Sequence, residues 1–276
     1  MSKSWIEDLE PGAVQHYDDA LYYDFTYQDH RDDIAFYREI AKQNTLGGPI
    51  LELGAGSGRI TIPLAREGHA LVGIDASEPM LAQARVNAAE HLNAAQRKRI
   101  TWVHGDMREF AFEQKFSLVI APFNALLHLY HPADFARCFA CVVRHMSPGA
   151  RFVFDVRMPN LKELSRDPDR VYKARGFDHP SLGYRVRYEE QFDYDAIQQV
   201  QHVVLRMTPA KNAPPDAKIV ETVLSQRQIF PSELRALLAL GGLALDKRFG
   251  DYDRSPLVPD SSVQIIVARA ITEART

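Results

Sequence analysis

The stretch Leu51-Glu52-Leu53-Gly54-Ala55-Gly56-Ser57-Gly58-Arg59 decides the fold. An apolar run ends in three alternating glycines, and a helical pattern begins directly after them. Glycine lets the backbone approach a ligand closely, and a helix that starts after such a loop brings its N-terminus near that ligand. The stretch therefore predicts a buried strand, a ligand-binding loop and a helix, in this order.

Outward from this loop, short β-rich runs alternate with helical patterns. Because strands joined by helices form right-handed crossovers, this alternation predicts a parallel sheet with helices on both faces. A proline-first, glycine-last helix and two further apolar runs follow late in the chain. We expect strands near 49–53, 70–75, 100–104, 116–121, 151–155, 243–245 and 263–267, and helices from about 59 and at 79–92, 132–145 and 231–242.

Two segments depart from this alternation. Residues 184–189 alternate apolar and charged side chains, as in a strand with one wet face, and 197–207 and 219–228 are further β candidates. Residues 17–43 are aromatic-rich and mostly helical in pattern. We therefore expect an N-terminal helical lid (1–45), a ligand-binding core (46–157 and 229–276) and a small antiparallel cap inserted after the fifth strand (158–228).

The composition favours a small-molecule partner. The 276 residues include 46% hydrophobic side chains, enough for a sizeable core without disulfides or a structural metal, and the formal net charge is −3. A nucleic-acid-binding protein would normally show a basic excess, so we expect no nucleic-acid partner. No secretory signal and no apolar run of about 20 residues is visible, so we expect a cytoplasmic protein without a membrane partner. The oligomeric state is not indicated.

The two cysteines, Cys138 and Cys141, form a Cys-x-x-Cys pair that suggests a redox or zinc site. They lie inside a helical pattern, where residues three apart share a face and cysteine serves as a small apolar side chain. A zinc site would require two further ligands, and the sequence offers no second pair. We therefore interpret both cysteines as core residues and expect no metal.

Two details of the glycine loop identify its ligand class. A dinucleotide-binding loop requires glycine at the sixth position of G-x-G-x-x-G, where this chain has Arg59, which disfavours an NAD-dependent oxidoreductase. Glu52, at the strand end, would repel a pyrophosphate but attract an ammonium group. A ligand that combines an α-amino group with adenosine and has no diphosphate satisfies both conditions, and S-adenosylmethionine is such a ligand.

With these motifs the chain resembles the class I S-adenosylmethionine-dependent methyltransferases, in particular the small-molecule branch that includes glycine and sugar N-methyltransferases. The resemblance implies a Rossmann-like fold, with a seven-stranded sheet that is mostly parallel and has one antiparallel strand. It also implies S-adenosyl-L-methionine as cofactor, with S-adenosyl-L-homocysteine as product. It places the methionine end on the glycine loop, the ribose hydroxyls on Asp75 and the adenine beside Met80, Asp106 and the amide of Met107. The cofactor-binding residues that we expect are Tyr27, Glu52, Gly54, Ala55, Gly56, Gly58, Asp75, Ala76, Met80, Asp106, Met107 and Phe123.

The substrate-binding residues come from three segments that resemble the same branch. The run after the fourth strand, which contains Asn124 and His128, is similar to its Asn-Ser-x-x-His-Leu motif, and His128 is the candidate catalytic residue. The tyrosine-rich segment with Tyr17 and Tyr23 resembles its lid. Arg157, two residues beyond Asp155, is similar to an arginine that binds a substrate carboxylate in glycine-methylating relatives; the other interpretation is a structural arginine.

The sequence thus predicts methyl transfer to an N, O or C nucleophile of a small metabolite, with nitrogen slightly favoured. The alternative is a catalytically silent subunit that binds S-adenosylmethionine or a partner, against which the carboxylates Glu52, Asp75 and Asp106 argue. The identity of the acceptor is not indicated, because the predicted cap is the least family-like part of the chain.

Overall fold

A computed structural model describes residues 9–271 of the chain. These residues divide into two compact units. The larger unit contains His30–Met158 and the chain from Ile229 onward. The smaller unit contains the segment up to Asp29 together with Pro159–Gln228.

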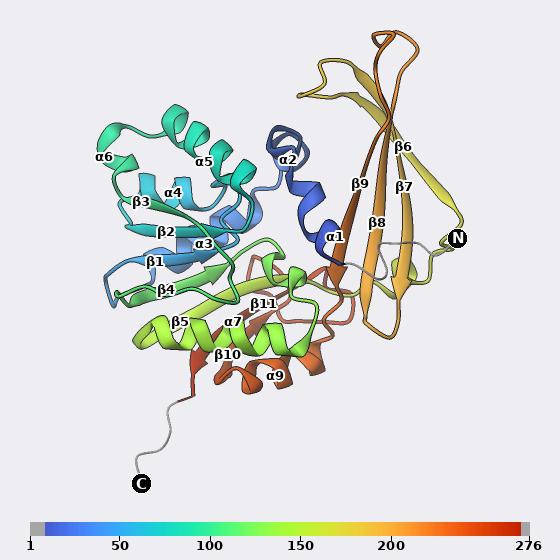
Figure 1. The fold of residues 1–276 in the computed structure, drawn as a ribbon. Coiled ribbons are helices and arrows are strands. Elements are labelled where there is room, and N and C mark those ends of the chain that lie inside the picture. The colour runs from blue at the N-terminus through green and yellow to red at the C-terminus, as the bar shows by residue number, and fades with distance from the viewer. Residues whose placement is uncertain (1–8, 272–276) are drawn as a thin grey trace. The chain divides into compact units, whose positions relative to one another are not determined.

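The larger unit is built on a seven-stranded sheet (Figure 1), which confirms the predicted Rossmann-like α/β fold. The strand order is β10-β11-β5-β4-β1-β2-β3. Strands β1 to β5 run parallel, and β11 is antiparallel to both of its neighbours. The strands are β1 (Ile50–Leu53), β2 (Leu71–Asp75), β3 (Ile100–His104), β4 (Phe116–Ala121), β5 (Met146–Arg157), β10 (Leu243–Phe249) and β11 (Val263–Ala270).

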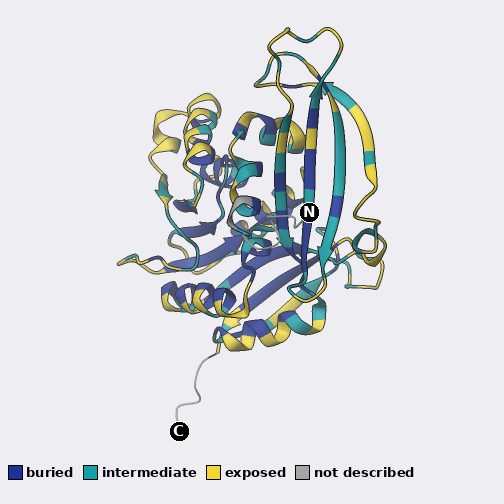
Figure 2. Cartoon of the chain, turned by 45° about the vertical axis from the view of Figure 1, so that its right-hand side comes forward, coloured by how far each residue is buried: buried dark blue, intermediate teal, exposed yellow. Residues whose placement is uncertain are grey.

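Helices cover both faces of this sheet, α3 to α5 on one side and α7 and α9 on the other (Figure 1). Residues such as Phe135 and Phe139 of α7 pack against one face, and Phe36, Tyr37 and Leu64 pack against the other. Figure 2 shows the consequence, since the central strands are buried while the outward turns of α7 and α9 are exposed. The helices are α3 (Asp32–Lys42), α4 (Thr61–Arg66), α5 (Glu78–His91), α6 (Ala94–Arg97), η3 (Ala125–His128), α7 (Pro132–His145) and α9 (Pro231–Leu240).

The fifth strand differs from its prediction. We expected this strand at 151–155, whereas β5 begins at Met146, which pairs with Phe116 of β4, and ends at Arg157. The register between β4 and β5 then shifts before Leu118 pairs with Arg151. An irregularity of this kind absorbs extra residues without ending the strand, so the Ser-Pro-Gly segment lies inside β5.

The smaller unit is a four-stranded antiparallel sheet in the order β6-β7-β8-β9, with the N-terminal helices packed on it. The backbone amide of Val223 donates to Oε1 of Gln15 (3.2 Å), and the ring of Tyr22 stacks on Phe177 (5.7 Å) and His179 (4.9 Å). Its elements are α1 (Glu10–Val14), η2 (Gln15–Tyr17), α2 (Ala20–Tyr27), α8 (Leu161–Leu164), β6 (Val171–Asp178), β7 (Arg185–Asp195), β8 (Val200–Pro209) and β9 (Val220–Arg227).

Two features of the smaller unit were not apparent in the sequence. Strand β6 lies at the edge of its sheet and exposes most of its side chains, so it lacks a clear apolar pattern. The segment expected as one helical lid is also divided, because α1 to α2 belong to the smaller unit and α3 to the larger. No helix among residues 9–271 combines the length and the apolar character required to cross a membrane.

Candidate functional site

The carboxyl ends of the parallel strands bring the predicted site residues of the larger unit to one edge of its sheet. Strands β1, β2, β3, β4 and β5 run in the same direction, so the segments that follow them share this edge. In open α/β sheets, ligands bind outside the carboxyl ends of the strands. The edge is therefore the candidate site, and it includes the glycine loop.

The glycine loop folds back over the end of β2. The amides of Gly54 and Ala55 both donate to the carbonyl oxygen of Ile74, at 2.9 and 3.0 Å. Gly54 has a φ of +70°, and a Cβ placed on it would lie 2.7 Å from the Cβ of Ala125. A side chain there would both strain the backbone and displace the neighbouring loop, so the position requires glycine.

Glu52 is buried beneath this loop, with 2% of its surface exposed. The hydroxyl of Thr61 donates a hydrogen bond to its Oε2. Burial raises the pKa of Glu52 to about 8, although the Thr61 hydrogen bond and the charge of Arg59 oppose this shift. A positive ligand group near this carboxylate would favour its ionised form.

Asp75 connects the ends of β1 and β2. Its Oδ2 accepts a hydrogen bond from the amide of Gly56 (2.7 Å), and its Oδ1 accepts one from the amide of Ser77 (2.8 Å). Burial raises the pKa of Asp75, and these two hydrogen bonds oppose the shift. Because each carboxylate oxygen has about two acceptor sites, each oxygen can accept one further donor, which matches the two hydroxyl groups of a ribose.

The residues after Asp75 form the adjoining wall. Ser77 caps α5 by accepting a hydrogen bond from the amide of Met80 (3.3 Å). The buried Met80 side chain lies under the glycine loop, since its Cε is 3.3 Å from the position of a Cβ on Gly56. The carbonyl oxygen of Ala76 is hydrogen-bonded to Nε2 of His104 (3.0 Å). Ala76 and Met80 thus lie in the same region as the glycine loop.

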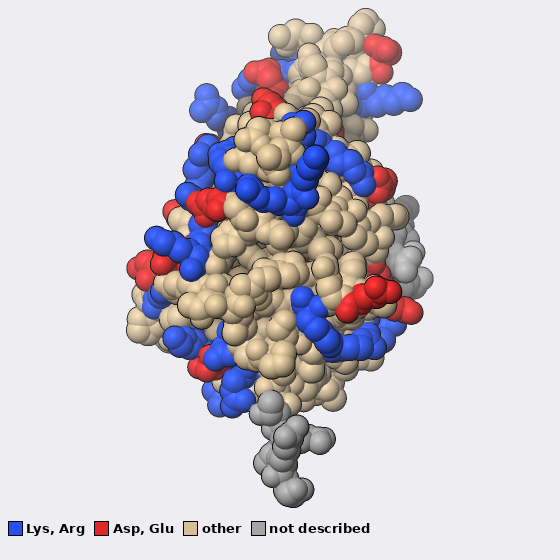
Figure 3. Space-filling model, turned by 90° about the vertical axis from the view of Figure 1, so that its left-hand side faces the viewer, with Lys and Arg blue, Asp and Glu red and all other residues tan. Residues whose placement is uncertain are grey.

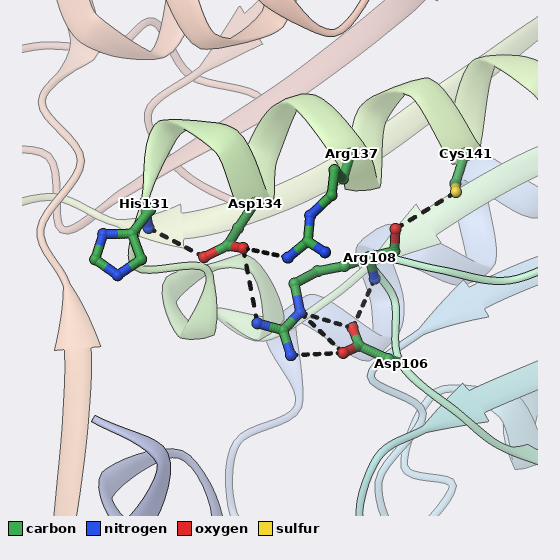
Figure 4. Close-up of polar contacts among 6 residues, drawn as sticks. All are labelled: Asp106, Arg108, His131, Asp134, Arg137 and Cys141. Carbon is green, nitrogen blue, oxygen red and sulfur yellow. Dashed lines mark hydrogen bonds and ion pairs between the residues drawn. The ribbon is translucent and has the colours of Figure 1, made fainter. Parts of the chain in front are cut away.

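Asp106 follows β3 and forms an ion pair with Arg108 (Figure 4). The Arg108 side chain donates to both carboxylate oxygens, at 2.6 to 3.0 Å, and its amide donates to Oδ1 (2.7 Å). Partial burial opposes ionisation, but these hydrogen bonds hold the pKa of Asp106 below its usual range. The Asp106 side chain remains 42% exposed, so acceptor capacity is left for a ligand amino group.

Arg108 also connects this segment to α7 (Figure 4). Its guanidinium lies 3.7 Å from the Asp134 carboxylate, which in turn pairs with Arg137 at 2.7 Å. Cys141, on the same helix, is directed at the carbonyl oxygen of Arg108 (3.5 Å). Cys138 and Cys141 are both buried members of the hydrophobic core, and burial raises the pKa of the Cys138 thiol. The residue between Asp106 and Arg108, Met107, packs partly against this core.

The segment after β4 carries the predicted acceptor residues. Phe123 and Asn124 both have positive φ values, +53° and +67°, and Asn124 is the N-cap of the short helix η3, which ends at the half-buried His128. We name residues 122–128 the acceptor loop. Oδ1 of Asn124 accepts a hydrogen bond from the backbone amide of Arg157 (2.6 Å), so the structure brings these two predicted residues together.

A residue that we did not predict lies beneath the acceptor loop. Asp155 has none of its surface exposed, and it accepts hydrogen bonds from the Tyr37 hydroxyl (2.7 Å) and from the amides of Phe123 (3.0 Å) and Asn124 (3.3 Å). Burial raises the pKa of Asp155, and the Tyr37 and Phe123 hydrogen bonds oppose the shift. A single acid in the otherwise apolar run of β5 was the available signal.

Arg59, which argued against a dinucleotide-binding loop, contacts the acceptor loop. Its guanidinium lies 4.3 Å from the centroid of the Phe123 ring. It also forms a two-pronged ion pair with the fully buried Asp33 and donates to the carbonyl oxygen of His30 (2.9 Å). The cation is thus fixed by Asp33 while it stacks on the aromatic face. Phe123 is therefore connected to the glycine loop.

The three predicted tyrosines lie in the smaller unit and surround a histidine that we did not predict. The His16 ring centroid lies 5.3 Å from that of Tyr17 and 6.1 Å from those of Tyr23 and Tyr27. Its Nε2 is 3.2 Å from the Tyr27 hydroxyl, and burial lowers the pKa of His16 to about 4. The tyrosines thus form one cluster around a neutral imidazole.

Comparison with known proteins assigns a family to the central part of the chain. Residues 50–149, which contain the glycine loop, Asp75, Asp106 and the acceptor loop, match the family model described as a methyltransferase domain. These residues form a methyltransferase domain. The resemblance seen in the sequence is thereby confirmed for this part of the chain.

Relatives of this methyltransferase domain share part of their length with the chain. The chain is 35% identical over 134 residues to the putative methyltransferase YqeM of Bacillus subtilis, a match that covers 48% of the chain and 51% of YqeM. It is 26% identical over 117 residues to the cypemycin N-terminal methyltransferase of a Streptomyces species, covering 41% and 43% of the two chains. The chain thus spans about half the length or less of these curated relatives.

Solved structures show the same fold around the methyltransferase domain. The CcbJ methyltransferase of Streptomyces caelestis aligns with a TM-score of 0.77 at 23% identity, over 94% of this chain and 99% of CcbJ. S-adenosylmethionine-bound CalS10, an amino pentose methyltransferase of Micromonospora echinaspora, aligns with a TM-score of 0.64 at 18% identity, over 89% and 95%. At these identities the likeness shows the fold.

Replacing Glu52 by glutamine should change how stability depends on pH. The folded chain keeps a proton on Glu52 up to about pH 8, whereas the unfolded chain releases it near pH 4.5. The stability that this proton contributes is fully present below pH 4.5 and is lost as the pH rises through about 8. Glutamine cannot titrate, so wild type should lose stability relative to Glu52→Gln by about 1.4 kcal/mol per pH unit within this window.

Urea unfolding between pH 5 and pH 9 measures this difference. The exposed Glu113 provides the control, because Glu113→Gln should follow the wild-type profile. Parallel stability profiles for wild type and Glu52→Gln would contradict the assignment of the buried proton to Glu52.

Proposed function

We propose that this chain transfers a methyl group from S-adenosyl-L-methionine to a nucleophile of a small molecule, with an amine nitrogen as the favoured acceptor. The observation that carries the proposal is the set of three carboxylates, Glu52, Asp75 and Asp106, at the ends of three neighbouring strands around the glycine loop. Each has the chemistry that one part of this cofactor requires.

The residues fit the proposed cofactor. Glu52 is a buried acid with a raised pKa, suited to pair with an ammonium group directly or through water. Asp75 retains one acceptor site on each oxygen for the two ribose hydroxyls. The buried Met80 and the exposed carboxylate of Asp106 offer an apolar wall and an acceptor for adenine. Gly54 and Gly56, with φ values of +70° and +55°, give the loop the left-handed backbone conformation that glycine adopts readily.

When bound, S-adenosylmethionine supplies a methyl group on a positively charged sulfur. The chain itself has to hold and orient the acceptor, because a neutral amine already presents its lone pair, and orientation can provide most of the rate enhancement. In this proposal Asn124 and His128 of the acceptor loop contact the acceptor, and His128 takes up the proton that the nitrogen releases. Arg157, at the end of β5, binds an anionic or hydrogen-bond-accepting group of the same molecule.

Comparisons support an amine acceptor. The cypemycin enzyme is named as an N-terminal methyltransferase, CalS10 acts on an amino pentose, and the structurally similar MtfA (TM-score 0.58, 24% identity, 86% of each chain) is a glycopeptide N-methyltransferase. The charge distribution is also compatible with a small molecule, since Lys and Arg are interspersed with Asp and Glu on the face shown in Figure 3. Within this proposal, Tyr27 remains a predicted cofactor-binding residue, and Tyr17 and Tyr23 remain predicted substrate-binding residues.

Formation of S-adenosylhomocysteine with a panel of acceptors tests the proposal. The panel contains amino sugars, amino acids and peptides with a free N-terminus, each paired with an analogue in which a hydroxyl replaces the amine. We expect turnover with at least one amine and at least tenfold less with its hydroxyl partner, which needs a base more than a neutral amine does. Tight cofactor binding without any turnover would instead favour the catalytically silent subunit.

Replacing Asp75 by alanine should weaken cofactor binding. The variant loses both proposed ribose contacts and the acceptor for the Gly56 amide, so we expect the Kd for S-adenosylmethionine to rise by about tenfold or more. Calorimetry measures this change. Glu78→Ala is the control, because Glu78 is an exposed residue at the start of α5 that pairs only with Arg85 in the ion pairs described, and its Kd should equal that of wild type. Wild-type affinity in Asp75→Ala would show that another residue anchors the ribose.

Replacing Arg157 by lysine tests the proposed contact with the acceptor. Lysine keeps the charge but loses the planar fork that binds two oxygens at once, so KM for an anionic acceptor should rise by about tenfold or more. KM for an uncharged acceptor should not change, which provides the control. A variant with unchanged KM and kcat but a lower Tm would assign Arg157 to the scaffold.

A further inference from the structure

The acceptor loop begins with an unfavourable backbone conformation. Phe123 and Asn124 are consecutive residues with φ values of +53° and +67°. This left-handed region is disfavoured for residues with a Cβ, more for a bulky aromatic residue than for asparagine. The folded protein must therefore hold this turn in place, and the contacts that do so control the loop behind it.

Asp155 makes the contacts that hold the turn. Its Oδ1 accepts a hydrogen bond from the amide of Phe123 (3.0 Å) and its Oδ2 one from the amide of Asn124 (3.3 Å), so it binds both left-handed residues. The carboxylate is itself fixed by the hydroxyl of the fully buried Tyr37 (2.7 Å). Because Asp155 is excluded from water, these donors and the hydroxyl of Tyr252, which also hydrogen-bonds to it, replace the hydration of its carboxyl group, so losing either backbone amide is costly.

A second residue at the end of β5, Arg157, also contacts this turn. Two residues after Asp155, the amide of Arg157 donates to Oδ1 of Asn124 (2.6 Å). The orientation of Asn124 is thus fixed by two hydrogen bonds to β5, one from its backbone amide to Asp155 and one from the amide of Arg157 to its side chain. A strand in the centre of a sheet is a rigid support for such contacts.

The turn is also packed against the glycine loop. The Cβ of Ala125 would be 2.7 Å from a Cβ on Gly54, so the two loops touch where glycine is required. On the other side of the turn, the guanidinium of Arg59 stacks on the Phe123 ring at 4.3 Å. A displacement of the turn would therefore move the acceptor loop relative to the proposed cofactor loop.

We propose that Asp155 is a positioning residue for methyl transfer, which holds the Phe123–Asn124 turn in its left-handed conformation and so fixes the acceptor loop against the glycine loop. It acts through the backbone of the turn. The inference rests on the proposed function for its effect on turnover, whereas its effect on the loop is independent of that function.

The substitution Asp155→Asn tests this role. Asparagine is close in shape but has one acceptor oxygen and one donor amide group, so one of the two backbone amides would face another donor. We expect amide hydrogen exchange in residues 122–128 to become about tenfold faster, because the turn opens more often. We expect kcat to fall about 10- to 100-fold, since a displacement of about 1 Å is enough for such a loss. The Kd for S-adenosylhomocysteine should stay within about threefold of wild type.

A milder variant covers the case in which Asp155→Asn fails to fold. Tyr37→Phe removes one of the donors to Asp155 and keeps the apolar ring in its place, so it should raise exchange in residues 122–128 and lower kcat by a smaller factor. Val153→Ala is the matched control. Val153 is buried on the same strand and, two residues away, on the same face as Asp155, and its truncation lowers Tm without altering the hydrogen bonds to the turn. Its kcat and its exchange in residues 122–128 should equal those of wild type.

The outcomes separate this inference from the proposed function. Faster exchange in residues 122–128 and a lower kcat in Asp155→Asn and Tyr37→Phe, but not in Val153→Ala, support it. Wild-type exchange in these residues, or a lower Tm with unchanged kcat, overturns it and makes Asp155 purely structural. If wild type methylates no acceptor, the proposed function fails, while the exchange measurement still decides whether Asp155 holds the loop.

Discussion

Buried carboxylates at one edge of the sheet are the constraint to which the rest of the site conforms. Glu52, Asp75 and Asp155 lie at or near the ends of three parallel strands and are largely removed from water. A carboxylate in such a place is tolerated only where hydrogen-bond donors replace its hydration. The segments that follow the strands supply most of these donors, so the conformations of these segments are set by the acidic groups they surround.

The donors differ in kind, and the difference has a functional meaning. Glu52 is bound by the hydroxyl of Thr61, and its raised pKa favours the uncharged form until a positive group is near. Asp75 and Asp155 are instead bound by backbone amides, which fixes the course of the chain itself. One carboxylate is thus suited to respond to a ligand, while the other two give the loops their shape before any ligand binds. Such preorganisation lowers the cost of orienting reactants.

Arg59 joins the two halves of this edge. It directly follows the glycine loop, is neutralised by the buried Asp33, and presents its planar face to Phe123 of the acceptor loop. A lysine would keep the charge but could not form the two-pronged contact and the stack at the same time. The residue that interrupts the glycine pattern in the sequence therefore connects the glycine loop to the acceptor loop.

Local sequence was sufficient for the architecture of the larger unit. Strands β3 and β4 and helix α7 have the predicted bounds, and β1 begins one residue later than predicted, because each is a continuous apolar or amphipathic run that ends at a glycine, proline or polar residue. The position of Glu52, Asp75 and Asp106 at the carboxyl edge of the sheet followed from the alternation of strands and helices, whereas the strand order came from the structure. Edge strand β6 escaped prediction, since an exposed strand obtains its stability from hydrogen bonds to its neighbour and not from an apolar pattern.

The sequence by itself determined the glycine loop, the order of the acidic residues and hence the methyltransferase domain, because these features depend on residues close together in the chain. The tertiary structure decided what the acids contact. Tyr37 and Asp155 are separated by 118 residues, and Arg59 and Asp33 by 26, and no local pattern marks either pair. The sequence showed a tyrosine-rich segment, but it did not show that the tyrosine rings surround His16. That contact arises only when α2 and η2 bring the rings together. Residues close together in the chain determine the helices and strands. The hydrogen-bond donors to a buried acid come from distant parts of the chain, so only the folded structure identifies them.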